Sequence, residues 1–275
     1  MLTGDTMALL KIGTFNIKNC YEKNKKIENA KILIDIIQKE KIDILGTQEL
    51  TKEYEKILKK KLKNYKICGG YRFGNLPFFN KYNENNIIIT NKNVLNSKTI
   101  RLPWIAKKLN DFKTSIQKKS IMPRIATLIS IHDYKIGKLV VINTHLDHKI
   151  SAVKQMQLDK IKKIISKYYE KYPIILTGDF NLQLKDEIFN KFVNELEKYN
   201  LKKIIINDNT WIGKDGTGKT IDHIFIPQKW NLIKTKVINN HGISDHNPII
   251  IDVEVEDKIK VNKFIQTIKE KLKIN

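Results

Sequence analysis

The stretch Ile174–Leu182, with the sequence IILTGDFNL, gives the clearest indication of how this chain folds. A short apolar run after Pro173 predicts a buried strand, and Gly178 is expected to break it. Asp179 and Asn181 are two residues apart, so on an extended backbone their side chains point to the same side. Such an acid and amide can hold a cation, accept a proton from water and bind a phosphate oxygen. Alone, the pattern is more typical of a strand that ends in a polar turn, so the other motifs must decide.

Length and composition favour one large domain. The chain has 275 residues, of which 41% are hydrophobic, and it contains no linker, internal repeat or apolar run long enough to span a membrane. Residues 1–10 lack the features of a signal peptide. The two cysteines, Cys20 and Cys68, make neither a disulfide framework nor a metal cluster. These features predict a cytoplasmic protein, and we expect a monomer.

The formal charge of +22 has two interpretations. A strongly basic chain is typical of a protein that binds nucleic acid or another polyanion. However, only Arg72, Arg101 and Arg124 are arginines among 51 basic residues, and the lysines are spread along the whole chain. That skew is also typical of compositional drift, so the charge leaves both interpretations open.

Hydrophobic periodicity predicts alternating strands and helices, which is typical of an α/β architecture. Strands are expected at 9–17, 42–47, 65–68, 87–90, 124–127, 139–143, 174–177, 204–206, 220–225 and 249–255. Helices are expected at 27–37, 52–62, 152–169 and 186–199. The polar, aromatic stretch 102–120 is too long for an ordinary connection and is typical of a functional or disordered loop.

Five or six of these strands begin or end with a polar group. The groups contain Asn, Glu, Asp and His but no cysteine, and they are centred on Asn16, Glu49, His145, Asp179, Asp222 and Asp245. Oxygen ligands without thiolates suit a hard cation such as Mg²⁺ or Mn²⁺. Histidines beside carboxylates suit charge stabilisation and proton transfer. Hydrolysis of a phosphate ester needs both, because negative charge develops on the phosphoryl and leaving oxygens together.

Six motifs, in order, resemble the endonuclease/exonuclease/phosphatase superfamily. They are FNI at Asn16, QE at Glu49, NTHLD at His145, GDFN at Asp179, IDHIF at Asp222 and SDHNP at Asp245. The resemblance extends from about Leu9 to Val255. The superfamily includes deoxyribonuclease I, AP endonucleases, sphingomyelinases and inositol polyphosphate 5-phosphatases. The resemblance implies a four-layer sandwich of two packed mixed β-sheets flanked by helices.

The resemblance also implies a metal site. Glu49 would be the principal ligand of Mg²⁺, with Mn²⁺ as the alternative. Asn16 would lie beside it, at the metal and the phosphate, and Asp245 would lie near the metal.

The proton chemistry implied by the resemblance involves Asp179, Asn181, Asp222 and His246. Asp179 would orient or deprotonate the attacking water, and Asn181 would hold the phosphate. His246 would stabilise the pentavalent phosphorus. Neighbouring side chains on an extended backbone point to opposite sides, so Asp245 is poorly placed to orient His246. Asp222, on another strand, is the expected partner, and the resemblance agrees.

The remaining residues implied by the resemblance surround the phosphate. His145 would contact it from the other side, steadied by Glu84, and Arg124 would add a positive charge facing the phosphate. Asp147 and His148 are candidates for the rim of the site.

We therefore expect a Mg²⁺-dependent phosphoester hydrolase, specifically a phosphodiesterase that cleaves nucleic acid. The alternative substrate is a small or lipid phosphate, and a third interpretation is a non-catalytic nucleic-acid-binding relative. Residues 1–255 would form the catalytic domain. Residues 256–275 would form a basic amphipathic helix, packed on the domain or extended as an arm for a partner or membrane surface.

Overall fold

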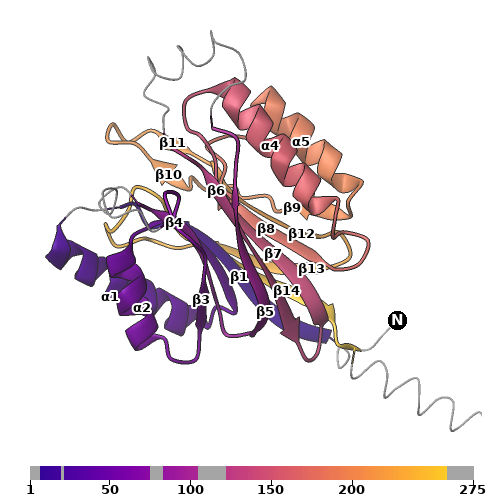
Figure 1. The fold of residues 1–275 in the computed structure, drawn as a ribbon, viewed down its shortest axis with the longest axis horizontal. Helices are drawn as coiled ribbons and strands as arrows, with labels where there is room; N and C mark the ends of the chain where they lie inside the picture. The colour runs from indigo at the N-terminus through magenta and orange to yellow at the C-terminus, as the bar shows by residue number, and fades with distance from the viewer. Residues whose placement is uncertain (1–6, 20–21, 75–82, 105–121, 259–275) are drawn as a thin grey trace, which may run out of the picture.

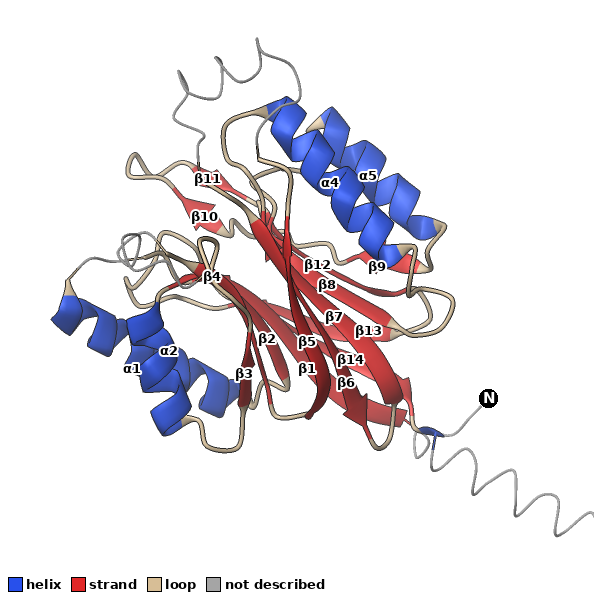
Figure 2. Cartoon of the chain, in the orientation of Figure 1, coloured by secondary structure: helices blue, strands red, loops and turns tan. Residues whose placement is uncertain are grey.

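Two six-stranded β-sheets lie face to face at the centre of the computed structural model, which describes residues 7–19, 22–74, 83–104 and 122–258. Helices α1 (Lys23–Glu40) and α2 (Lys52–Lys61) cover the outside of one sheet. Helices α4 (Ser151–Ile165) and α5 (Glu187–Glu197) cover the other (Figure 1). Figure 2 shows the resulting order of helix, sheet, sheet and helix. The predicted four-layer α/β sandwich is therefore confirmed.

The first sheet contains both chain-terminal strands of the described region. Its strand order is β13 (Asn231–Val237), β14 (Ile249–Glu256), β1 (Met7–Asn16), β2 (Ile44–Leu50), β4 (Asn85–Thr90) and β3 (Lys66–Cys68). β1 and β2 are parallel, and the other neighbours are antiparallel. The sheet is therefore mixed.

The second sheet has the same mixed character. Its strand order is β5 (Asn93–Arg101), β6 (Ile125–Asp133), β7 (Gly137–His145), β8 (Ile174–Asp179), β12 (Asp222–Pro227) and β9 (Leu201–Lys203). Only β7 and β8 are parallel among its pairs in the described region. A short hairpin of β10 (Trp211–Ile212) and β11 (Gly218–Lys219) lies outside both sheets.

Three hydrophobic layers hold the sandwich together. The middle layer packs one sheet on the other and includes Ile12, Ile44, Ile129, Val141 and Ile224, each fully buried. The outer layers pack each sheet against its two helices. Strands buried on both faces have continuous apolar runs rather than alternation, and β8 is buried along its whole length. This double burial explains why residues 174–182 gave the strongest strand signal.

Helix α2 illustrates how the local sequence sets a helix. Tyr54 and Leu58, four residues apart, are its buried side chains and pack under the first sheet. Glu53 and Glu55 lie in its first turn and three lysines lie in its last turn, which complements the helix dipole. The predicted helix at 52–62 is confirmed.

The structure corrects several expectations. Gly178 does not break β8. A Cβ at this position would lie 2.2 Å from the Thr144 carbonyl oxygen, so only glycine, which has no Cβ, allows the strand to continue here. The strand expected at 204–206 lies earlier, at β9. Ile204 and Ile206 instead follow β9 and fill the core between the sheets. Edge strands β5 and β13 were not predicted.

Two predicted segments fall mainly outside the described residues. These are most of the 102–120 loop, from residue 105 onward, and the C-terminal helix, from residue 259 onward. Strand β14 ends at Glu256, next to the boundary expected between the catalytic domain and the C-terminal helix. Among the helices that can be described, none has the length and apolar character needed to cross a membrane.

Candidate active site

Strand register brings the predicted polar residues to one end of the sandwich. In the first sheet, parallel pairing places Asn16 beside Gln48, next to Glu49. In the second sheet, Asp179 is opposite both His145 and Asp222. The parallel strands β7 and β8 end at this edge of the second sheet, and the antiparallel strand β12 begins there, so the three residues lie together. These strand ends surround a cavity of about 690 Å³.

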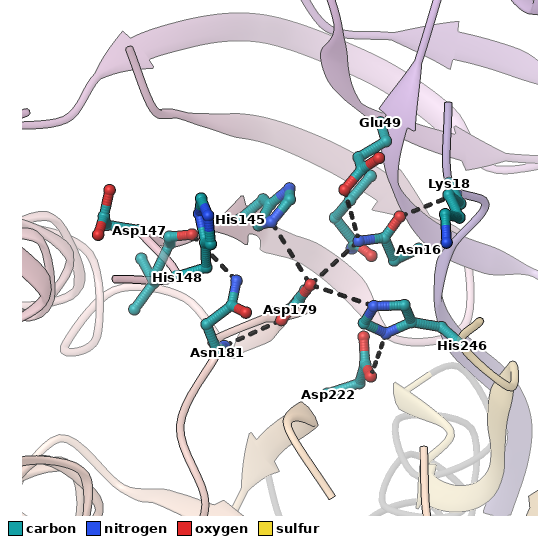
Figure 3. Close-up of polar contacts among 12 residues, drawn as sticks. Asn16, Lys18, Glu49, His145, Asp147, His148, Asp179, Asn181, Asp222 and His246 are labelled. Atoms are coloured by element: carbon teal, nitrogen blue, oxygen red, sulfur yellow. Dashed lines mark hydrogen bonds and ion pairs between the residues drawn. The ribbon is translucent and has the colours of Figure 1, made fainter. Parts of the chain in front are cut away.

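Asp179 is the centre of the polar contacts in this cavity (Figure 3). It is 1% exposed, and its Oδ2 accepts a hydrogen bond from Asn16 Nδ2 at 3.0 Å. The same oxygen lies 3.4 Å from His145 Nε2 and 3.7 Å from His246 Nε2. Burial, followed by the charge of Asp222, raises the pKa of Asp179 to about 7. A carboxyl group with such a pKa can exchange a proton near neutral pH.

His246 and Asp222 form a close charged pair within the site. His246 Nδ1 lies 2.8 Å from Asp222 Oδ2, which also accepts a hydrogen bond from Thr210 Oγ1 at 2.7 Å. Burial alone would lower the pKa of His246, but the carboxylates of Asp222 and Asp179 outweigh it and raise the pKa to about 10. The ring is therefore cationic at neutral pH. The predicted pairing of His246 with Asp222 is present, and Thr210 is a partner that the sequence motifs did not indicate.

His145 has the opposite electrostatic character. Burial, and after it the positive charges of Arg124 and Arg72, hold the pKa of His145 well below its ordinary value. The ring is therefore neutral. A neutral imidazole and a cationic one thus lie on the two sides of the Asp179 carboxylate.

Asn181 lies in the cavity for a different reason from the one predicted. Its φ is +50°, so the backbone after Asp179 turns and is not extended. The turn lets the Asn181 backbone N–H donate to Asp179 Oδ1 at 2.9 Å, while Nδ2 donates to the Leu146 carbonyl at 3.2 Å. Lys154 Nζ holds the Asn181 carbonyl at 2.9 Å.

Glu49 lies across the cavity, on the first sheet. Its φ is +61°, an unfavourable value for a non-glycine residue, at an irregularity of β2 between Thr47 and Leu50. Oε1 accepts from Asn16 Nδ2 at 3.2 Å, and Oε2 accepts from the Asn19 backbone N–H at 3.1 Å. The distorted backbone directs this carboxylate into the cavity.

The carboxylates of Glu49 and Asp245, here called the Glu49 wall, fit a hard divalent cation such as Mg²⁺ or Mn²⁺. Asn16 lies beside Glu49, with Nδ2 donating to Glu49 and Oδ1 accepting from the Lys18 backbone N–H at 2.9 Å. Asp245 Oδ2 is paired with Lys18 Nζ at 2.7 Å, which the motifs did not predict. A second group, Asp179, Asp222 and His246, has potential ligand atoms within 4.8 Å of one another. This group is a second candidate position for the cation.

The predicted contact between Glu84 and His145 is wrong. Glu84 lines the cavity, but it is held by an ion pair with Arg72 and accepts from Asn19 Nδ2 at 3.2 Å. Within the described part of the chain, no hydrogen bond or ion pair joins it to His145. Arg72 was missed, although its rarity in a lysine-rich chain could have drawn attention to it.

Arg124 and the two predicted rim residues also lie at the cavity. Arg124 is 7% exposed, and its Nη2 lies 3.2 Å from Nδ1 of His148. Asp147 lines the same wall, with its Oδ1 accepting backbone N–H bonds from Lys149 and Ile150 at 2.8 Å each. All the predicted site residues therefore surround this one cavity or lie directly behind its wall.

The cavity at one end of the two-sheet sandwich brings together carboxylates, amides and histidines, the groups that hydrolysis of a phosphoester needs. The profile of the Endonuclease/Exonuclease/phosphatase family matches residues 13–246. The chain therefore belongs to the endonuclease/exonuclease/phosphatase family, whose members are phosphoester hydrolases. Comparison with curated protein sequences gives no match.

Solved structures show the same fold at low sequence identity. A family protein from Bacteroides thetaiotaomicron has a TM-score of 0.73 at 18% identity, covering 91% of this chain and 99% of that one. A mannosyl-6-phosphatase from the same organism has a TM-score of 0.71 at 18% identity, covering 89% and 99%. The catalytic domain of human Nocturnin, with bound sulfate, has a TM-score of 0.68 at 17% identity, covering 89% and 93%.

Proposed function

We propose that the protein is a phosphodiesterase that cleaves nucleic acid by in-line attack of water on phosphorus. The observation that carries the proposal is the position of the Asp179 carboxylate. It is buried between a neutral and a cationic imidazole, and Asn16 joins it by hydrogen bonds to the Glu49 wall. Such a group can orient a water molecule and accept its proton, while the cationic ring stands where negative charge develops.

Each remaining residue has a role in this mechanism. His246 stabilises the phosphoryl oxygens in the transition state, and Asp222 acts through His246 by fixing the orientation of the ring and stabilising its positive charge. His145 contacts the phosphate from the opposite side, and Asn181 donates to a phosphate oxygen. Arg124 adds a positive charge toward the phosphates of the substrate.

Glu49, Asn16 and Asp245 would hold Mg²⁺ or Mn²⁺. When bound, the cation neutralises charge on the phosphoryl and leaving oxygens. Asn16 also has a second role, because its Nδ2 bridges Glu49 and Asp179 and so fixes the base side of the cavity relative to the metal side. Glu84 contributes through Arg72, which it holds in the wall of the cavity.

Two features support nucleic acid as the substrate. The chain has a formal charge of +22, and beside its six carboxylates the cavity wall contains Arg124, Lys154 and Lys219, which form no ion pair among the described residues. Positive charge of this kind attracts a phosphodiester backbone. We further propose a cytoplasmic monomer in which residues 1–255 form the catalytic domain.

A small phosphate ester is the second candidate substrate. The observation that favours it is the fold shared with a mannosyl-6-phosphatase. A lipid phosphate is a further variant of the same alternative, and a non-catalytic nucleic-acid-binding protein is the third.

A single substrate screen separates these candidates. Purified protein is incubated with plasmid DNA, single- and double-stranded oligonucleotides, RNA, mannose 6-phosphate and phosphoinositides, with Mg²⁺, Mn²⁺ or EDTA. We expect cleavage of a nucleic acid in the divalent cations and none in EDTA, with Asp179→Asn as the inactive control. Release of phosphate from only the small or lipid substrates would show that the protein is a phosphatase and not a nuclease. Binding of nucleic acid without hydrolysis of any substrate would support the third candidate, a non-catalytic nucleic-acid-binding protein.

A further inference from the structure

The cavity contains buried cations of two different kinds. Arg72, Arg124 and Lys154 are 8%, 7% and 9% exposed, so each has lost most of its contact with water. Arg72 is neutralised by an ion pair with Glu84. Arg124 and Lys154 form no ion pair with any carboxylate among the residues that can be described. A buried charge without a counter-ion is unfavourable, which indicates that these two cations are kept for a ligand.

Arg124 has donor capacity that the protein does not use. Its hydrogen-bond partner is neutral: Nη2 donates to His148 Nδ1 at 3.2 Å. Its Nε is buried and has no hydrogen-bond partner in the described structure. A guanidinium presents donors in a planar fork that matches two phosphate oxygens. Because Nδ1 of His148 accepts from Arg124, the neutral ring carries its proton on Nε2, a further donor at the rim.

Lys154 completes the same wall from helix α4. Its ammonium donates to the Asn181 carbonyl at 2.9 Å, again a neutral partner. The nearby carboxylates are engaged by backbone donors: Asp147 Oδ1 accepts from Lys149 and Ile150, and Asp186 Oδ2 accepts from Gln183 at 2.7 Å. The charges of Asp147 and Asp186 still act on this wall through space and partly balance those of Arg124 and Lys154. What the wall offers a ligand is the set of donors on Arg124 and Lys154 that no carboxylate of the described residues engages.

One strand separates Arg124 from Asp179, where the reacting phosphate is proposed to bind. Arg124 immediately precedes β6, Asp179 ends β8, and β7 lies between them. At about 4.8 Å between neighbouring strands, the two backbones are roughly 10 Å apart. The guanidinium of Arg124 contacts His148, which lies beyond the end of β7. A phosphate at Asp179 therefore leaves room for a second anionic group at Arg124.

We propose that Arg124, His148 and Lys154 form a second phosphate subsite, which binds a phosphate of the same substrate next to the one that reacts. The inference rests on the proposed phosphodiesterase function and specifies its substrate class. The preferred substrate carries at least two phosphates, as a nucleic-acid strand or a nucleotide bisphosphate does. A phosphoester with a single phosphate fills only the reaction centre.

Two chromogenic substrates test the subsite directly. Both are p-nitrophenyl esters on the 5′-phosphate of thymidine, and one carries an additional 3′-phosphate. We expect kcat/KM to be roughly tenfold higher for the 3′-phosphorylated ester, mainly through KM, since a charge-assisted hydrogen bond contributes about that factor. Lys154→Met and Arg124→Gln should reduce this ratio to within about twofold. Lys160→Met, on the exposed face of the same helix, should preserve it.

A binding measurement tests the subsite independently of catalysis. Calorimetry in EDTA compares thymidine 3′,5′-bisphosphate with thymidine 5′-monophosphate on the full-length protein, and a melting curve checks that each variant is folded. Tighter binding of the bisphosphate that is lost in Lys154→Met supports the subsite even if neither ester is hydrolysed, in which case only the proposed function fails. Equal binding of the two nucleotides by the wild-type protein, or equal kcat/KM for the two esters, overturns the subsite. A preference that survives both substitutions overturns it as well.

Discussion

Gln48 and Asn143 join the two sheets directly beneath the active site. Gln48 Nε2 donates to Asn143 Oδ1 at 2.7 Å, although the residues lie in different sheets. Asn143 Nδ2 in turn donates to the carbonyls of Thr47 and Ile87 at 2.8 and 3.0 Å. Gly46 makes this approach feasible, because a Cβ there would lie 2.6 Å from Asn143 Oδ1. The link sets the distance between the Glu49 wall and the Asp179 wall of the cavity.

Replacing Asn143 with leucine should destabilise the protein by about 3 kcal/mol. The substitution leaves two buried carbonyls and one Gln48 N–H without the partner they have now, and an unsatisfied buried group costs about 1–3 kcal/mol. Urea denaturation measures the loss. Asn194→Leu, an exposed position, should change stability by less than about 0.5 kcal/mol. Equal stability of the two variants would show that the polar link is dispensable.

Glu49→Gln should abolish most activity without unfolding the protein. The amide removes the charge that attracts a hard cation, and we expect kcat to fall by at least about 100-fold. Mg²⁺ should raise the melting temperature of the wild type more than that of the variant, because a ligand stabilises the native state in proportion to how tightly it binds. Glu53→Gln, an exposed position on α2, serves as the control. Wild-type turnover of Glu49→Gln at low Mg²⁺ would exclude this residue as the ligand.

Asp222→Asn and His246→Ala should reduce the rate by similar factors, and the double variant should lose little more. Asp222 acts through the ring of His246 at 2.8 Å, so removing either residue removes the same stabilised cation. Residues that act as a unit give such non-additive effects. The kinetics of the two single variants and the double variant, in saturating Mg²⁺, measure the coupling. Losses that multiply in the double variant would show that the two residues work independently.

Stability should fall as the pH decreases from about 6.5 to about 3, partly because of His223. Burial, and then the charge of Lys203, lower the pKa of His223 to about 3, while its ring remains 2.8 Å from the Leu182 carbonyl. Below its ordinary pKa of about 6.5, the unfolded chain takes up a proton that the native state excludes. Each unit of pKa difference corresponds to about 1.4 kcal/mol, so the loss amounts to several kcal/mol.

The control for this effect is His223→Gln, which keeps an N–H donor but does not titrate. Denaturant unfolding between pH 7 and pH 4 should show a shallower decrease in stability for the variant than for the wild type. Parallel pH profiles for the two proteins would assign the acid sensitivity to other groups.

Local sequence alone was sufficient to predict the inner strands and the helices, whereas the set of site residues was predicted from six motifs and the family that they resemble. Strand β8 is buried on both faces, so its sequence is apolar without interruption, and its local pattern alone identifies it. Helix α2 has buried side chains four residues apart, which is equally a local signal. The alternation of neighbouring side chains made Asp245 a poor partner for His246, and the family resemblance implied Asp222 in its place.

The edge strands and the pairing of distant charges, by contrast, depend on the tertiary structure. β5 and β13 expose many of their side chains, so their sequences lack the apolar pattern of an inner strand. Arg72 and Glu84 meet where Tyr71 pairs with Asn85 at the start of β4, a contact that no local pattern encodes. The charge balance of the cavity is likewise a tertiary property. A cation is neutralised or left for a ligand according to which distant residue packs beside it, as Arg72 and Arg124 show.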